Sequence, residues 1–162
     1  MFYAAQSKMF ELNLPKAEIK LENRNGKPSI WDQTRKKWLQ LTPEEYVRQH
    51  FVHYLIHTLG YPASLISIER GIEVVRLSRR TDIVVYDKKG HPFLLIECKA
   101  PQVTLTRMTS EQIAAYNLTI KAPYLAMTNG FHHYFFQIDF ASSSFSAISQ
   151  LPSVEELYGR EN

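Results

Sequence analysis

The chain has 162 residues, of which 44% are hydrophobic and 22% are charged, and its formal net charge is +3. This is the composition of an ordinary globular protein, and the length is that of one domain. A single cysteine excludes an internal disulfide, no apolar run is long enough to cross a membrane, and no GxxxxGK[ST] motif is present. The N-terminus lacks the apolar run of a secretory signal, so we expect a cytoplasmic protein without membrane contact.

Residues 1–41 predict a β extension packed on the core. Residues 17–23 alternate between polar and apolar types, an Asn-Gly turn follows at residues 25–26, and residues 29–31 return as the second strand of a hairpin. A further turn leads into a third strand at residues 37–41.

This extension carries two tryptophans and a short basic run. We interpret Trp31 and Trp38 as hydrophobic cover for the edge of the domain. The run Arg35-Lys36-Lys37 could contact phosphate, although such a run is more often a solvated turn.

A helix is predicted to begin after Thr42, which is a good N-cap followed by Pro43 and two acidic residues. Gly60 and Pro62 mark its end. Glu45 lies three residues after Thr42, so it can close a capping box, and it is also a candidate acid for a functional site. Both roles remain open for Glu45.

Other polar residues of this helix carry weaker signals. Arg48 and Gln49 follow Glu45 by one turn and could face the same cleft, although we favour a helix surface pair. His53 and His57 have the spacing of a metal-binding pair, but no HExxH motif accompanies them, so we interpret them as a polar helix flank.

Two apolar runs form the centre of the sequence. Residues 64–75 predict a strand that enters the sheet, and residues 83–86 and 93–96 predict a hairpin around a polar turn that contains a glycine. Four consecutive apolar residues in each hairpin strand indicate that both faces are covered. This pattern is typical of central strands in a sheet flanked by helices.

Three charged residues interrupt these apolar strands. Glu97 and Lys99 are two residues apart, so a strand directs both to one face and Cys98 to the other. A hairpin centred just after Lys89 sets Asp82 opposite Glu97, with Cβ atoms about 4.5–5.5 Å apart. Two carboxylates at that distance repel each other unless a cation lies between them, and hard divalent cations prefer oxygen ligands.

The alternative is that Glu97 and Lys99 are solvated charges near a strand end and that Asp82 caps a turn. The hairpin register decides between the two interpretations. A bulge would shift the pairing by one residue and turn Asp82 away from Glu97.

A second helix is predicted over residues 109–120. Gln112 and Tyr116 are four residues apart and share one face of it. One interpretation of the two residues is that Gln112 closes a capping box with Thr109 while Tyr116 packs in the core.

The rest of the chain predicts two more strands and a short helix. Residues 123–128 predict a buried strand, and residues 132–140 predict a strand that returns antiparallel. The tail beyond Phe145 is predicted to be peripheral, with a short helix at residues 153–157.

Asp82, followed after fourteen residues by Glu97-x-Lys99, resembles the PD-(D/E)xK nuclease signature. The wider sequence resembles the N-terminal nuclease domain of the R subunit of type I restriction enzymes. That resemblance covers roughly residues 41–139, through the segments TPEEYVRQHFVHYLI, RTDIVVYD, LLIECKAP, EQIAAYN and PYLAMTNG.

The order of elements predicts an α/β fold with a mixed sheet flanked by helices, and the resemblance implies a restriction-endonuclease-like sheet over residues 42–162. In the expected site, Asp82 and Glu97 hold Mg²⁺ or Mn²⁺ with the backbone carbonyl near Cys98, and Lys99 orients the attacking water. The resemblance adds Glu45 as a further acid.

The resemblance implies that Gln112 and Tyr116 line the DNA side of the site. Arg80 is expected to contact the phosphate backbone, and the alternative is that it neutralises the acidic cluster. The predicted function is Mg²⁺-dependent endonuclease cleavage of DNA. The alternatives are a catalytically silent nuclease-fold module that binds DNA or a helicase or restriction partner, and a purely structural domain. Candidate partners are DNA, a helicase or translocase, restriction-modification subunits and a second copy of the chain.

Overall fold

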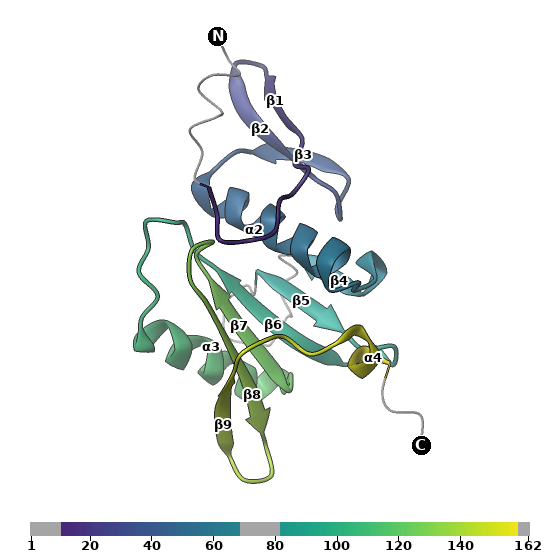
Figure 1. Cartoon of the computed structure of the whole chain (residues 1–162), viewed down its shortest axis with the longest axis vertical. Helices are drawn as coiled ribbons and strands as arrows, with labels where there is room; N and C mark the ends of the chain where they lie inside the picture. The colour runs from purple at the N-terminus through teal and green to yellow at the C-terminus, as the bar shows by residue number, and fades with distance from the viewer. Residues whose placement is uncertain (1–10, 69–81, 159–162) are drawn as a thin grey trace.

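Helix α2 lies between two β-sheets in the computed structural model, which describes residues 11–68 and 82–158 (Figure 1). On one side of the helix is a small antiparallel sheet, and on the other is a six-stranded mixed sheet with helix α3 on its far face. The chain is therefore an α/β protein with an N-terminal β extension, as the sequence predicts. Within the described residues, no helix has the length and apolar character needed to span a membrane.

The small sheet contains β1 (Leu21–Arg24), β2 (Lys27–Asp32) and β3 (Lys37–Gln40) in that order. Its first turn is the predicted Asn-Gly turn. Asn25 and Gly26 have φ values of 52° and 76°, and a two-residue turn of type I′ requires positive φ at both positions.

The six-stranded sheet has the order β4-β5-β6-β7-β8-β9. Strands β6 and β7 pair in parallel, while the other described neighbours are antiparallel. Its strands are β4 (Ile66–Ile68), β5 (Ile83–Tyr86), β6 (Pro92–Cys98), β7 (Tyr124–Thr128), β8 (His133–Asp139) and β9 (Ser144–Ile148).

Helix α3 connects the two parallel strands β6 and β7, because parallel neighbours need a crossover connection. The helical segments are α2 (Pro43–His53) with a π-helical turn (Tyr54–Thr58), a 3-10 turn (Ala63–Leu65), α3 (Arg107–Ile120) and α4 (Val154–Leu157).

The central strands are buried on both faces, as their continuous apolar runs predict. One cluster packs β5 and β6 residues against α2 and includes Phe51, Ile83 and Ile96. A second cluster packs the alternate residues against α3 and includes Val84 and Leu95.

Two predictions about the second half of the chain were wrong. Helix α3 begins at Arg107 and its N-cap is Thr106, because this threonine offers the same capping chemistry three residues before Thr109. Thr109 closes the capping box, so Gln112 is not its N3 residue.

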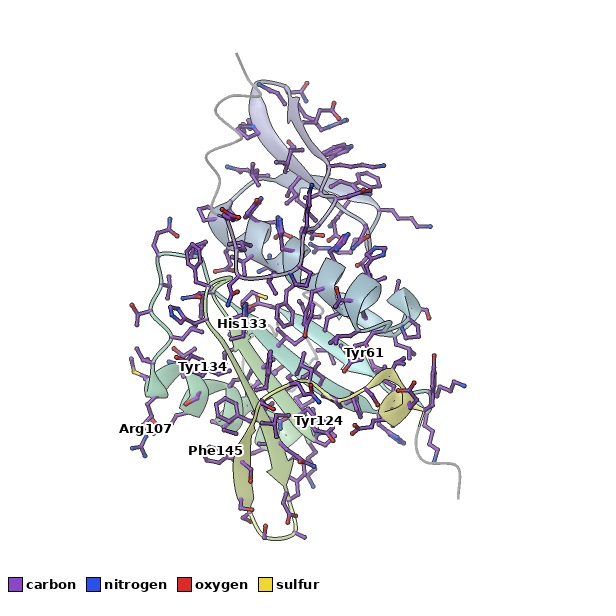
Figure 2. The ribbon with its side chains drawn as sticks, viewed as in Figure 1. Tyr61, Arg107, Tyr124, His133, Tyr134 and Phe145 are labelled. Atoms are coloured by element: carbon purple, nitrogen blue, oxygen red, sulfur yellow. The ribbon has the colours of Figure 1, made fainter. Side chains whose placement is uncertain are left out.

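The C-terminal tail is part of the core rather than peripheral. Leu151 and Leu157 are buried in the α2-side cluster, and the Tyr61 hydroxyl donates to the Pro152 carbonyl at 2.5 Å. Figure 2 shows Tyr61 and Tyr124 beside this segment. Strand β9 was missed: its sequence SFSAI alternates between polar and apolar residues, but the segment is short and four of its five residues are exposed.

Gly130 holds the N-terminal segment against the β7–β8 turn. Its φ is 88°, its carbonyl accepts the Asn13 N–H at 2.8 Å, and a Cβ atom there would lie 2.6 Å from Leu12 Cδ2 and 3.2 Å from Val47 Cγ2. Close approach of the segment to the turn therefore depends on the absence of a side chain at this position.

We predict that Gly130→Ala lowers the free energy of unfolding by about 1 kcal/mol more than Gly90→Ala in urea titrations. Gly90 has a similar φ of 83°, but a Cβ atom added there would have nothing within 4 Å, so it controls for backbone strain alone. Equal losses in the two variants would contradict a packing role for Gly130.

Candidate functional site

Strands β5 and β6 pair in the predicted register at the end of the hairpin that lies away from its turn. Ile83 faces Ile96 and Val84 faces Leu95. The pairing ends at Ile83, and one further step in the same register would set Asp82 opposite Glu97. The turn differs from the prediction, because an irregularity after Val85 shifts the pairing there by one residue. The bulge thus lies on the turn side of the pairing, away from the end of the hairpin that leads to Asp82 and Glu97.

Asp82 is fixed by two donors from different elements. Its Oδ2 accepts the Cys98 N–H at 2.7 Å, and its Oδ1 accepts from Arg48 Nη2 at 3.0 Å. One oxygen is therefore held by the end of β6 and the other by helix α2. The carboxylate has a defined orientation at the junction of the hairpin and the helix.

Glu97 and Lys99 form a partly exposed ion pair, with 2.9 Å between Lys99 Nζ and Glu97 Oε1. Burial is the main cause that raises the pKa of Glu97 to about 7, and the negative charge of Asp82 raises it further. The pKa of Lys99 is also raised, chiefly by its hydrogen bond to Glu97. These effects agree with two nearby carboxylates and one ammonium group.

The burial of Arg48 and its contact with Asp82 were not predicted from the sequence. It is 3% exposed rather than on the surface, and its Nη2 lies 3.0 Å from Glu44 Oε1 as well as 3.0 Å from Asp82 Oδ1. Its Nη1 donates to Glu45 Oε2. Acids three and four residues before Arg48 were the available signal, because such pairs meet on a helix.

Glu45 makes one of the two hydrogen bonds of the predicted capping box. Its N–H donates to Thr42 Oγ1 at 3.1 Å, but its carboxylate accepts from Arg48 and from Gln49 Nε2, the latter at 2.8 Å. Gln49, predicted to lie on the surface, is 1% exposed. Of the two acids at the start of α2, it is Glu44 whose charge contributes to the raised pKa of Glu97.

The remaining candidates are distributed around the site. The Cys98 thiol is buried in the α2-side cluster, which raises its pKa, so the group of Cys98 available to a metal is its backbone carbonyl. Tyr116 is buried and packs in the α3-side cluster with Val84 and Leu95, which is the alternative given for it from the sequence. Gln112 is exposed, and Arg80 lies outside the described residues.

Metal binding would rely on few side chains. Across residues 11–68 and 82–158, no group of three or more His, Cys, Asp or Glu side chains is arranged to hold a metal ion. The candidate ligands are the carboxylates of Asp82 and Glu97 with the Cys98 carbonyl. This all-oxygen, doubly negative set fits a hard divalent cation that keeps several water ligands, as Mg²⁺ does.

The chain matches a known family over most of its length. The family model described as the type I restriction enzyme R protein N terminus matches residues 43–152, and the chain belongs to this family. The match begins at α2, so strands β1–β3 lie outside it. The resemblance recognised from the sequence is thereby confirmed.

A solved structure shares the fold. The chain is similar to a fragment assigned to the HsdR subunit of a type I restriction enzyme from Vibrio vulnificus YJ016, with a TM-score of 0.51 and 18% sequence identity. The similarity covers 72% of this chain and 24% of that chain, so this chain spans about a quarter of that structure. No curated protein sequence matches the chain.

We predict that Arg48→Met lowers the free energy of unfolding by about 3 kcal/mol or more, because it leaves the carboxylates of Glu45 and Asp82 without this buried partner. Glu44→Gln removes an acid whose side chain is 45% exposed, so we expect it to cost less than about 1 kcal/mol. Urea unfolding monitored by circular dichroism measures both. A loss for Arg48→Met no greater than that of Glu44→Gln would contradict this role.

Proposed function

We propose that this chain hydrolyses phosphodiester bonds of DNA with a divalent metal ion, as the nuclease domain of a type I restriction R subunit. One observation supports the proposal: the Asp82 carboxylate accepts from the N–H of Cys98, the residue next to Glu97, and Lys99 is paired to Glu97 at 2.9 Å. The family membership, which is consistent with a restriction-related role, supports it.

Asp82 and Glu97 would hold Mg²⁺ or Mn²⁺ together with the Cys98 carbonyl. Such an ion lowers the pKa of a bound water and neutralises charge on the phosphate. The Arg48 guanidinium and the Cys98 N–H fix the two oxygens of Asp82, which keeps that carboxylate in one orientation. Their contribution is to reduce the reorganisation needed for binding.

Lys99 supplies a positive charge beside the phosphate. Its ammonium is within hydrogen-bond distance of Glu97 and 31% exposed at the side chain, so it can also donate to a phosphate oxygen. There it would stabilise negative charge that develops during cleavage and orient the attacking water. Gln112, which is exposed on α3, and Arg80 would position the DNA strand, while the buried Tyr116 would support α3 beneath it.

The chain would act within a larger assembly. It spans about a quarter of the structure that it resembles, and it carries no GxxxxGK[ST] motif of its own. We therefore propose that a helicase or translocase segment and restriction-modification subunits work with this domain, either on the same polypeptide or as partners.

A catalytically silent, DNA-binding module is the second candidate. It is favoured by the ion pair between Arg48 and Asp82, because this guanidinium already compensates a carboxylate that a metal ion would need. In that case the Asp82–Arg48 pair is a structural joint between α2 and the hairpin.

We predict that Lys99→Met and Asp82→Asn each lower Mg²⁺- or Mn²⁺-dependent nicking of supercoiled plasmid by at least about 100-fold, because each removes a charge needed at the reacting phosphate. Lys89→Met is the matched control, since Lys89 lies in the exposed β5–β6 turn, and it should nick like the wild type. Thermal melting establishes that the variants fold.

The same experiment separates the two candidate functions. Nicking that survives both site substitutions would refute the catalytic assignment. DNA binding without a metal-dependent product, and without metal binding in a calorimetric titration, would favour the silent module.

A further inference from the structure

The small sheet has one buried face and one accessible face. On the buried face, Ile30 and Asp32 have no solvent exposure. On the other face, Trp31 lies directly opposite Trp38 with 5.4 Å between ring centroids, and the exposed residues Arg24 and Lys27 face each other. We name this second surface, made by Arg24, Lys27, Trp31 and Trp38, the tryptophan face.

Arg24 extends along this face and joins its charged and aromatic parts. Its guanidinium carbon lies 5.3 Å from the centroid of the Trp38 ring, a cation–π geometry. Glu22 is an acidic neighbour at 3.4 Å from Arg24, and both side chains are about half exposed. The face therefore combines flat aromatic surface with cationic groups that solvent or a ligand can reach.

The positive charge of the chain is concentrated in this extension. Residues 16–41 contain seven Lys or Arg and three Asp or Glu, a net charge of +4, whereas the whole chain carries +3. One of the three acids, Asp32, is buried and bonded to Arg35, with 2.5 Å between Oδ2 and Nε. Lys20, Lys36 and Lys37 are exposed.

Ion pairs connect the extension to the candidate site. Arg35, in the β2–β3 turn, has its Nη2 3.8 Å from Glu45 Oε1, and Glu45 is paired with Arg48. Arg48 in turn holds Asp82. Buried or half-buried charges therefore run from the small sheet through α2 to the hairpin, and they fix the sheet relative to the site.

We propose that the tryptophan face binds the sugar–phosphate backbone of duplex DNA, with Arg24 and Lys27 on phosphates and the tryptophans against deoxyribose. The inference rests on the proposed function for the choice of DNA. Charge complementarity favours DNA as the ligand. The segment is more positive than the chain as a whole, so it attracts a polyanion. Backbone contacts of this kind set the register of a duplex without reading its sequence.

The test is fluorescence anisotropy of a labelled DNA duplex in EDTA, where binding is measured without metal-dependent cleavage. The double variant Arg24→Glu with Lys27→Glu is compared with Lys89→Glu with Lys121→Glu, two exposed lysines on other elements that give the same change of charge. We expect the first to weaken binding by about tenfold or more and to reduce the salt slope by about 2, and the second to stay within about twofold of wild type.

Three outcomes would overturn the inference: equal losses in the two double variants, wild-type affinity in the first, or no DNA binding by the wild-type chain. The milder pair Arg24→Ala with Lys27→Ala should show a smaller loss in the same direction, which covers misfolding of the charge-reversed protein. Binding that depends on Arg24 and Lys27 in a chain that never nicks DNA would refute the proposed catalysis alone. Normal nicking with unchanged affinity in the charge-reversed variant would refute the inference alone.

Discussion

A buried guanidinium joins the parts of this protein that matter for its candidate site. Arg48 contacts Glu44 and Glu45 within its own helix and Asp82 at the start of the central hairpin. Since uncompensated buried charges are costly, removal of any member of this set affects the others. The same contacts of Arg48 therefore determine both the position of α2 over the hairpin and the orientation of the Asp82 carboxylate.

The two sheets are organised around the helix that carries this arginine. The six-stranded sheet packs its apolar residues on one side of α2, and the β2–β3 turn reaches Glu45 from the other through Arg35. The family match begins at α2, so the small sheet is an addition to the shared domain. An ion pair between Arg35 and Glu45 connects this sheet to the helix.

Local patterns predicted most of the elements, because turn and cap chemistry act over a few residues. The Asn-Gly turn, the Thr42 N-cap and the doubly covered strands β5 and β6 follow from such signals. The start of α3 was wrong because two threonines could cap it. Strand β9 was missed although SFSAI alternates between polar and apolar residues, because so short and exposed a segment becomes a strand by pairing with β8.

The sequence by itself determined the family, the α/β class and the candidate trio of Asp82, Glu97 and Lys99, since spacing and strand alternation establish which residues share a face. Only the tertiary structure decided how the carboxylates are compensated. Glu44 and Glu45 indicated the helical ion pairs of Arg48, but its contact with Asp82 depends on a hairpin 34 residues away. Long-range packing brings Asp82 to that arginine, and no local pattern contains this contact.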